Sequence, residues 1–415
     1  MKERRRREFL RTLVGAASAG LLRVGQSAPA RLRVGVVGGG IVGASIALHL
    51  ARAGARVILF EKNAPAAGAT QNSFAWINAF VDDPHYRTLR LQSLHGYREL
   101  DRSLSLRITW GGYLDWASDA AEAETVRANA RQLADSPAPV QEINEDELVK
   151  LDPEVRPGVV AEAFYSSIDG HLDPVFVTRR FLDQAAKAGA QVLYPCAVTA
   201  LDIRMGRLKG VATTQGEFQL DRLVVAGGVD TPQILAMAGF TLGLKHAPGM
   251  LAHSAPLPPL TRRVHDAPGD VSFKQMADGS LVGTDAPSPP DIPPHRGIRA
   301  HAEDFPSAEL RDYHGNRILT KIERFLPASS GVPLDRLTLG YRPMPLDEFP
   351  VMGALPSLAD VYVAVTHSGV TLAPIVGRLT AEEVLGASRA AMFAPYRPER
   401  FARPAPSGAR PAPSG

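Results

Sequence analysis

The sequence predicts an α/β fold in which a doubly wound sheet is contributed in pieces and interrupted by a second domain. Three observations predict it. A strand, a glycine-rich turn, a helix and a second strand follow one another over residues 32–61. Residues 221–231 show a strand pattern that runs into glycines, and residues 361–386 show a strand, a glycine turn and then a helix. The segments between them carry amphipathic helical stretches and short strand candidates, which indicates a second unit with an antiparallel sheet. The 415 residues allow two or three domains.

The first thirty residues are typical of an export signal. Their seven basic and two acidic residues give +5, whereas the whole chain carries +3, so residues 31–415 carry −2. An apolar run at residues 12–22 precedes the small residues APA at 28–30, which is the order of a secretory signal. RREFLR at residues 6–11 adds the twin-arginine pattern. We expect residues 1–30 to be a twin-arginine signal peptide that directs the folded protein to the periplasm through the twin-arginine machinery. A basic disordered tail and a retained anchor are the alternatives, although eleven apolar residues cannot cross a bilayer.

Charge and cysteine content exclude several classes of protein. The chain after the leader has no basic footprint, so nucleic acid is not expected as a partner. A single cysteine, Cys196, excludes an internal disulfide and a cysteine-built metal site. We expect Cys196 to be a small core residue and predict no metal site.

Residues 32–61 carry a dinucleotide-binding motif. Residues 38–43 read GGGIVG and fit the pattern G-x-G-x-x-G, a largely apolar helix follows, and the strand at residues 56–60 ends in Glu61. The first glycine makes a tight turn, the second lets a pyrophosphate approach the backbone, and the third lets the helix pack on the strand. The phosphates would lie at the helix N-terminus, which favours anions. Because strand, glycines, helix, strand and acid stand in order, the motif predicts dinucleotide binding. Glu61 would accept hydrogen bonds from a ribose 2′-hydroxyl and disfavour NADP, while FAD and NAD both stay open.

Four segments together resemble the FAD-dependent D-amino-acid oxidase family, in the branch with glycine oxidase and sarcosine oxidase, over residues 32–395. They are the dinucleotide motif, GATQNSFAWIN at residues 68–78, DRLVVAGGVDT at residues 221–231, and RPMPLDEFPVMG with VYVAVTHSGVTLAP within residues 342–374. The resemblance implies an α/β fold: a Rossmann-like FAD-binding domain with a discontinuous second α+β substrate domain built on an antiparallel sheet.

The resemblance also implies a domain organisation, with the substrate at the junction of the two domains. We expect a twin-arginine signal peptide at residues 1–30, the FAD-binding domain at residues 31–84, 161–242 and 341–398, the substrate domain at residues 85–160 and 243–340, and a disordered Pro/Ser/Gly-rich tail at residues 399–415.

FAD is the cofactor that the resemblance implies. The residues expected to bind it are Gly38, Gly40, Ile41, Val42, Gly43, Glu61, Lys62, Thr70, Asn72, Ser73, Val198, Ala226, Gly227, Ser368, Gly369, Val370, Thr371 and Leu372. Some sarcosine oxidases attach flavin through a cysteine in the substrate half of the chain. Because Cys196 lies elsewhere, we expect non-covalent FAD.

Oxidising an amine next to a carboxylate needs few catalytic groups, because the flavin accepts a hydride and the protein mainly positions the substrate. A planar arginine is the best match for the carboxylate, and Arg342 stands where the resemblance places that residue. His367 would face the flavin or the substrate, or cap a helix. Lys274 would help dioxygen accept electrons, as a lysine does in sarcosine oxidases; a solvated lysine is the alternative. His253 and Tyr341 are further pocket candidates.

The sequence thus predicts an FAD-dependent oxidoreductase that oxidises a small amino acid or secondary amine of the glycine, sarcosine or D-amino-acid type. Hydride transfer to the flavin would give an imine that hydrolyses to an oxo acid, with oxygen or membrane quinone as electron acceptor. One alternative is an FAD-dependent 2-hydroxy-acid or polyol dehydrogenase on the same fold. Another is a non-catalytic flavin electron-transfer subunit.

Overall fold

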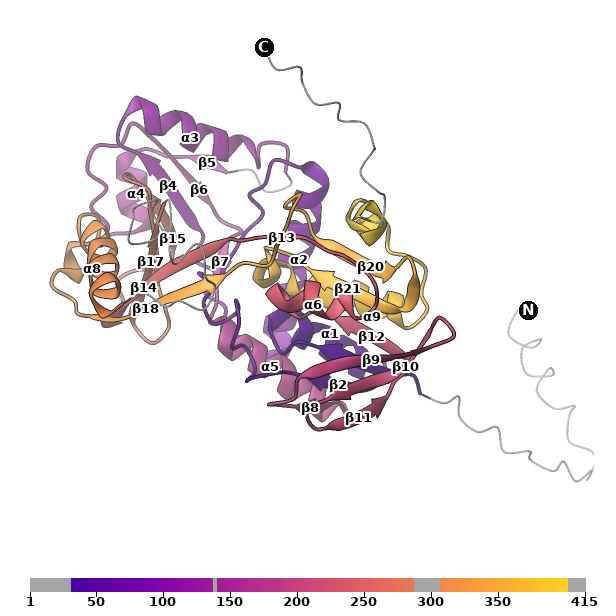
Figure 1. Cartoon of the computed structure of the whole chain (residues 1–415). Helices are drawn as coiled ribbons and strands as arrows, with labels where there is room; N and C mark the ends of the chain where they lie inside the picture. The colour runs from indigo at the N-terminus through magenta and orange to yellow at the C-terminus, as the bar shows by residue number, and fades with distance from the viewer. Residues whose placement is uncertain (1–30, 137–139, 287–306, 402–415) are drawn as a thin grey trace, which may run out of the picture. The chain divides into compact units, whose positions relative to one another are not determined.

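Two β-sheets organise the chain in the computed structural model (Figure 1). The structure describes residues 31–136, 140–286 and 307–401, and the predictions made for residues 1–30 lie outside the described residues. From Leu32 onward the described chain forms one compact unit.

The first sheet is six-stranded and mostly parallel. In spatial order its strands are β20 (Val351–Leu355), β21 (Leu358–Val365), β12 (Arg222–Val225), β1 (Arg33–Val37), β2 (Arg56–Phe60) and β8 (Gln191–Leu193). Neighbours pair in parallel except at one edge, where β20 runs antiparallel to β21. The predicted parallel sheet and its first two strands are confirmed.

Alternating side chains bury both faces of this sheet. In β12, Val224 points into one apolar core while Leu223 and Val225 point into the other, because successive strand residues face opposite sides. The first core is covered by helices α1 (Ile41–Arg52), α2 (Pro84–Leu104), α5 (Pro174–Lys187) and α9 (Gly369–Val384). The second is covered by α6 (Thr231–Ala236) and by a three-stranded sheet of β11 (Gly216–Gln219), β10 (Arg207–Thr213) and β9 (Val198–Arg204). A parallel sheet requires such cover on both faces.

Helix α2 begins at a cap that the sequence encodes. Asp83 Oδ1 accepts a hydrogen bond from the Tyr86 amide at 2.6 Å, and Pro84 takes the first turn, where a missing N–H costs nothing. The helix packs on α9, and its Leu89 and Tyr97 lie in the first core. Helix α2 therefore packs with the parallel sheet, although the sequence analysis assigned it to the second domain. The predicted domain boundaries as a whole stay a prediction.

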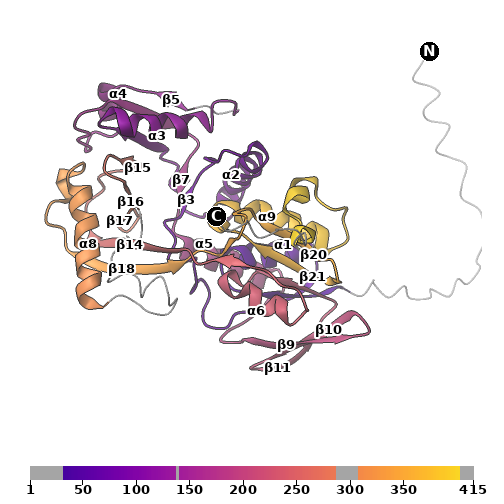
Figure 2. The same cartoon turned by 45° about the horizontal axis from the view of Figure 1, so that its top comes forward.

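The second sheet has eight strands. In spatial order they are β18 (Leu334–Tyr341), β14 (Pro248–Pro256), β17 (Ser280–Asp285), β16 (Val271–Gln275), β15 (Val264–Ala267), β4 (Tyr113–Ala117), β6 (Glu162–Ser166) and β5 (Gln141–Glu142). Among the strands that the structure describes in this sheet, only β15 and β4 pair in parallel. Figure 2 shows α8 (Ala308–Glu323) beside β14 and β18, where its Ile318 and Ile322 share an apolar core with Phe273 of β16.

Shorter elements complete the described chain. They are the strand pairs β3 (Trp76–Ile77) with β7 (Gly170–His171) and β13 (Leu244–Lys245) with β19 (Met344–Pro345), helices α3 (Ala120–Arg131) and α4 (Glu145–Leu151), and the 3₁₀ turns η1 (Gly228–Asp230), η2 (Pro327–Ser329), η3 (Ala391–Tyr396) and η4 (Pro398–Phe401). None of the helices in the described ranges combines the length and apolar character that a bilayer crossing requires.

The C-terminal boundary differs from the predicted one. Residues 399–401, which the sequence analysis placed in the disordered tail, form most of η4, and Arg400 Nε donates to Asp347 Oδ2 at 2.7 Å. This ion pair fixes the turn to the loop before β20. Residues 402–415 lie outside the described residues.

Candidate functional site

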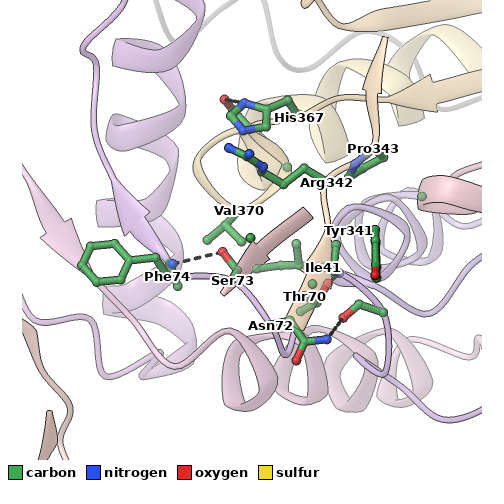
Figure 3. Close-up of a pocket in the computed structure, with 18 of the residues that line it drawn as sticks. Ile41, Thr70, Asn72, Ser73, Phe74, Tyr341, Arg342, Pro343, His367 and Val370 are labelled. Atoms are coloured by element: carbon green, nitrogen blue, oxygen red, sulfur yellow. Dashed lines mark hydrogen bonds between the residues drawn. The ribbon is translucent and has the colours of Figure 1, made fainter. Parts of the chain in front are cut away.

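One large cavity lies at the carboxyl ends of the first sheet and against one face of the second (Figure 3). Its volume is about 1330 Å³, which exceeds the roughly 300–1,000 Å³ of an ordinary small-molecule pocket. The carboxyl ends of parallel strands are where α/β sheets bind ligands. The cavity therefore has room for a dinucleotide together with a small substrate.

The glycine loop between β1 and α1 forms one wall of the cavity. A Cβ added to Gly43 would lie 2.0 Å from the Gly38 carbonyl oxygen, and Gly38 has φ +107°, in the left-handed region. Gly40 precedes α1 and provides no side-chain cap, while the Ile41 amide donates to Thr70 Oγ1 at 3.1 Å. The loop thus presents the N-terminus of a twelve-residue helix to the cavity, where Thr70 occupies one of the helix amides, and such an N-terminus favours a pyrophosphate.

Glu61 stands at the end of β2 and lines the cavity beside this loop. Its Oε2 accepts from the Gly39 amide at 2.7 Å and its Oε1 from the Asn63 amide at 2.8 Å. Glu61 therefore braces the glycine loop as well as facing the place where the motif puts a ribose. Its neighbour Lys62 also lines the cavity and forms an ion pair with Asp230 at 2.8 Å.

Cys196 is a core residue, as predicted. Its side chain is fully buried in the second core of the parallel sheet, the one that α6 and the three-stranded sheet cover. Its amide donates to the Glu61 carbonyl oxygen at 2.6 Å. Cys196 also borders the cavity next to Val198, at the end that holds Glu61.

Two further segments close the cavity around its other end. One is the loop at 68–78 and the other is the N-terminal end of α9 with the residue before it. The residues of these segments that line the cavity include Thr70, Asn72, Ser73, Ser368, Gly369, Val370 and Thr371. The two segments meet where Thr371 Oγ1 donates to the Trp76 carbonyl oxygen at 3.3 Å. Ala226 and Gly227, after β12, line the cavity as well.

All the predicted FAD-binding residues line this cavity except Gly43 and Leu372. Gly43 lies behind the loop, and Leu372 is fully buried in the core under α9. The lining supplies a helix N-terminus for phosphates and an acid for a ribose, so the residues present fit a bound FAD.

Arg342 follows β18 and lines the cavity, where Figure 3 shows its guanidinium next to His367. Its Nε donates to the Ala247 carbonyl oxygen at 3.3 Å and its Nη2 to that of Pro248 at 3.2 Å. Partial burial lowers the pKa of Arg342, but an arginine stays charged. No carboxylate among the described residues forms an ion pair with it. The guanidinium is therefore available to a bound anion.

His367 also lines the cavity. Burial, followed by the charges of Arg342 and Arg90, lowers its pKa to about 4, with Glu348 acting in the opposite direction. The imidazole is therefore neutral at neutral pH, and its Nδ1 lies 3.3 Å from Ser368 Oγ. His367 does not cap α9, because the residue at that cap position is Ser368.

Lys274 lies on β16 and is 1% exposed, so the expectation of a solvated lysine is wrong. Its Nζ has no hydrogen-bond partner and lies 5.3 Å from the centre of the Phe74 ring. Burial lowers the pKa of Lys274 to about 7, against the attraction of Asp173. Phe74 lines the cavity and Lys274 does not. Of the two further pocket candidates, Tyr341 lines the cavity and His253 is buried outside it.

Sequence reasoning missed Arg90, Asn78 and Thr366, which all line the cavity. Arg90 belongs to an amphipathic helix, in which an arginine ordinarily faces solvent, yet it is buried here. No local pattern reveals such a residue, because only the packing of α2 on α9 brings it to the cavity.

A row of polar side chains crosses the second sheet and lines the same cavity. The cross-strand register aligns Asp115, Asp266, Ser272 and Thr284 of four neighbouring strands. Asn129 Nδ2 donates to Asp115 Oδ2 at 3.0 Å. Burial, and then the Asp266 charge, raises the pKa of Asp115 to about 7, and burial also raises the pKa of Asp266. In the described ranges no three His, Cys, Asp or Glu side chains are grouped so that they could hold a metal ion.

Comparison with known proteins relates this chain to one family. A family model described as "DAO: FAD dependent oxidoreductase" matches residues 33–383. The 4-methylaminobutanoate oxidase (formaldehyde-forming) of Paenarthrobacter nicotinovorans is 27% identical over 86% of this chain, and mitochondrial dimethylglycine dehydrogenase of Mus musculus is 26% identical over 64%. The chain spans only 44% and 32% of the lengths of these two relatives. Glycine oxidase of Bacillus licheniformis is 26% identical over 85% of this chain and 92% of its own length.

Solved structures share the fold. L-proline dehydrogenase from P. horikoshii superposes with a TM-score of 0.78 at 24% identity, covering 90% of this chain and 99% of that one. Glycine oxidase from Geobacillus kaustophilus superposes with a TM-score of 0.78 at 23% identity, covering 88% and 98%. The predicted fold class is confirmed.

Proposed function

Because the chain belongs to the FAD-dependent oxidoreductase family, whose model matches residues 33–383, we propose that it oxidises a small amino acid or secondary amine of the glycine, sarcosine or D-amino-acid type. Bound FAD would accept a hydride from the carbon next to the nitrogen. The resulting imine would take up water and divide into an oxo acid and an amine or ammonia. Relatives named glycine oxidase and dimethylglycine dehydrogenase support this substrate class.

The observation that carries the proposal is the position of Arg342. Its guanidinium lines the same cavity as the glycine loop and the turn before α9, and two backbone carbonyls hold it there. A planar guanidinium binds a carboxylate through two parallel hydrogen bonds. Arg342 would therefore bind the substrate carboxylate and orient the adjacent carbon. Neutral His367 beside it would accept a hydrogen bond from the substrate amine. The role of Lys274 in the oxygen reaction stays a prediction, since its amine contacts the Phe74 ring and Lys274 itself does not line the cavity.

The proposal is tested by mixing the purified holoprotein with candidate substrates without oxygen and following the loss of oxidised-flavin absorbance. The panel holds glycine, sarcosine, D- and L-amino acids, proline, 2-hydroxy acids and polyols. We expect an amino acid or N-methylamino acid to bleach the flavin. In Arg342→Lys, which keeps the charge but not the fork, we expect the substrate concentration for half-reduction to rise at least about tenfold, because one bidentate contact is lost. The matched control, Arg336→Lys, alters an exposed arginine paired with Asp335 and should change nothing. Unaltered reduction of Arg342→Lys would contradict the role of Arg342.

The position of His367 also supports a second function, the oxidation of a 2-hydroxy acid or polyol. A neutral His367 in the cavity is a group that would accept a proton from a hydroxyl, as oxidation of a 2-hydroxy acid or polyol requires. Bleaching by hydroxy compounds and not by amines would select this alternative. A non-catalytic electron-transfer subunit is less well supported, because Arg342 lines a cavity large enough for a substrate beside the cofactor.

We also propose that residues 1–30 export the protein to the periplasm by the twin-arginine route, after FAD is loaded in the cytoplasm. RREFLR at residues 6–11 supports this. Replacing Arg6 and Arg7 together by Lys should remove the protein from the periplasmic fraction of cells without lowering its FAD content. Wild-type protein that fractionates with the cytoplasm would contradict export. Oxygen or membrane quinone would then take the electrons, and anaerobic reoxidation of the reduced protein by a soluble quinone would distinguish the two.

A further inference from the structure

Helix α2 is tied to the N-terminal end of α9. Three side chains on one face of α2 donate hydrogen bonds there: Arg90 Nη2 to Oγ of Ser368, the residue before α9, at 2.6 Å, Ser93 Oγ to the Thr371 carbonyl oxygen at 2.7 Å, and Tyr97 Oη to the Val370 carbonyl oxygen at 2.5 Å. Val370 and Thr371 lie in the first turn of α9. We call these three residues the α2 clamp. Their spacing of three and then four residues places them in one stripe along the helix. The clamp fixes the turn that lines the cavity.

Arg90 differs from the other two members because it carries a buried charge. It is 9% exposed, and its Nη1 donates to Asn78 Oδ1 at 2.8 Å and to the Phe80 carbonyl oxygen at 3.0 Å, both uncharged acceptors. Its Nε is buried without a partner, and its guanidinium lies 4.9 Å from the centre of the Tyr86 ring. No carboxylate in the described part of the chain forms an ion pair with it. The charge of Arg90 acts to lower the pKa of Asp169, but the Asp169 carboxylate accepts its hydrogen bonds from Trp76 and Ser166.

Burying a guanidinium without a carboxylate partner lowers the stability of the folded state, so the position of Arg90 needs an explanation. The charge acts inside the cavity: Arg90 is one of the groups that lower the pKa of His367, and Arg90 itself is part of the lining. The same place holds the N-terminus of α9, a sixteen-residue helix without a side-chain cap, and the Ser368 hydroxyl before it accepts from Arg90. Helix N-terminus and guanidinium together favour a negative charge at this end of the cavity.

We propose that Arg90 is a positioning residue of the turn before α9 and that its unpaired positive charge makes the bound FAD easier to reduce. The inference rests on the proposed function, because it requires FAD in this cavity. Reduction places additional electron density on the flavin ring, and charge near that ring is one way a protein tunes a flavin. Ser93 and Tyr97 hold the first turn of α9 by hydrogen bonds alone, so only Arg90 is expected to act through charge.

The test is the midpoint potential of FAD in the holoprotein, measured without oxygen by equilibration with a reference dye. Arg90→Gln keeps amide donors near Asn78 and Ser368 but removes the charge, and Arg90→Lys keeps the charge. We expect Arg90→Gln to lower the equilibrium constant for two-electron reduction about tenfold, which is about 30 mV. Arg90→Lys should stay within about threefold of the wild type. Tyr97→Phe is the matched control: it removes one hydrogen bond of the clamp and no charge, and should leave the potential within the same limit.

The outcomes separate the possible roles. An unchanged potential in Arg90→Gln overturns the inference, and so does an equal shift in Tyr97→Phe, because the clamp would then act through geometry alone. If Arg90→Gln does not fold, Arg90→Met, an apolar replacement for a buried ion, carries the same expectation. Wild-type protein that binds no FAD would overturn the proposed function together with this inference, whereas a wild-type flavin whose potential does not depend on Arg90 overturns the inference alone.

Discussion

The close approach of the backbone at Gly43 requires a glycine beside the cofactor cavity. A methyl group there would lie 2.0 Å from the Gly38 carbonyl oxygen, so either α1 or the glycine loop would have to move. We expect Gly43→Ala to lower the free energy of unfolding by roughly 1–3 kcal/mol, the usual cost of overpacking, and to weaken FAD binding at least tenfold. Urea unfolding of the apoprotein and titration with FAD measure the two effects separately.

Gly68 provides the comparison at the same scale. A Cβ added there would meet no atom within 4 Å, so Gly68→Ala should change the free energy of unfolding by less than about 0.5 kcal/mol. If Gly43→Ala and Gly68→Ala lowered the free energy of unfolding equally, the close approach at Gly43 would not be the reason that a glycine is needed there.

The pairing of β4 with β15 makes stability depend on pH at the scale of whole elements. Their register places Asp115 beside Asp266, with Tyr113 and Asn129 as the other polar neighbours. Burial first, and then the Asp266 charge, raises the pKa of Asp115 to about 7, above the unfolded value of about 3.9. Between these two pH values the folded state therefore binds more protons than the unfolded chain. The stability that protonation contributes is lost as the pH rises from about 4 through about 7.

Asp115→Asn should remove that loss. We expect the stability of the variant relative to the wild type to be greater at pH 8 than at pH 5, by on the order of 2–3 kcal/mol. Urea unfolding at both pH values measures the difference. A stability difference that is the same at pH 5 and pH 8 would contradict the account, since an ordinary packing effect does not follow the titration of a carboxyl.

At the scale of the whole molecule, the sequence predicted what local patterns determine. The glycine loop and Glu61 lie together because β1, α1 and β2 are consecutive, so spacing alone placed them. Lys274 and the Asp115–Asp266 pair could not be assigned in this way, because the neighbours that matter are distant in sequence: Phe74 lies against Lys274, and β4 pairs with β15. Arg90 was missed because only tertiary packing turns that face of α2 toward α9. Local context therefore gave the cofactor motif, and long-range packing decided the charges around it.

The FAD content of the purified chain, before and after denaturation, decides whether the cavity holds this cofactor and how it is bound. We expect a yellow protein with one FAD per chain, and denaturation should release all of the flavin into solution, because Cys196 is buried at the Glu61 end of the cavity and we propose non-covalent binding. Flavin that stays attached to the denatured chain would contradict the non-covalent proposal. A colourless protein that also fails to bind added FAD would contradict the assignment of the cavity itself.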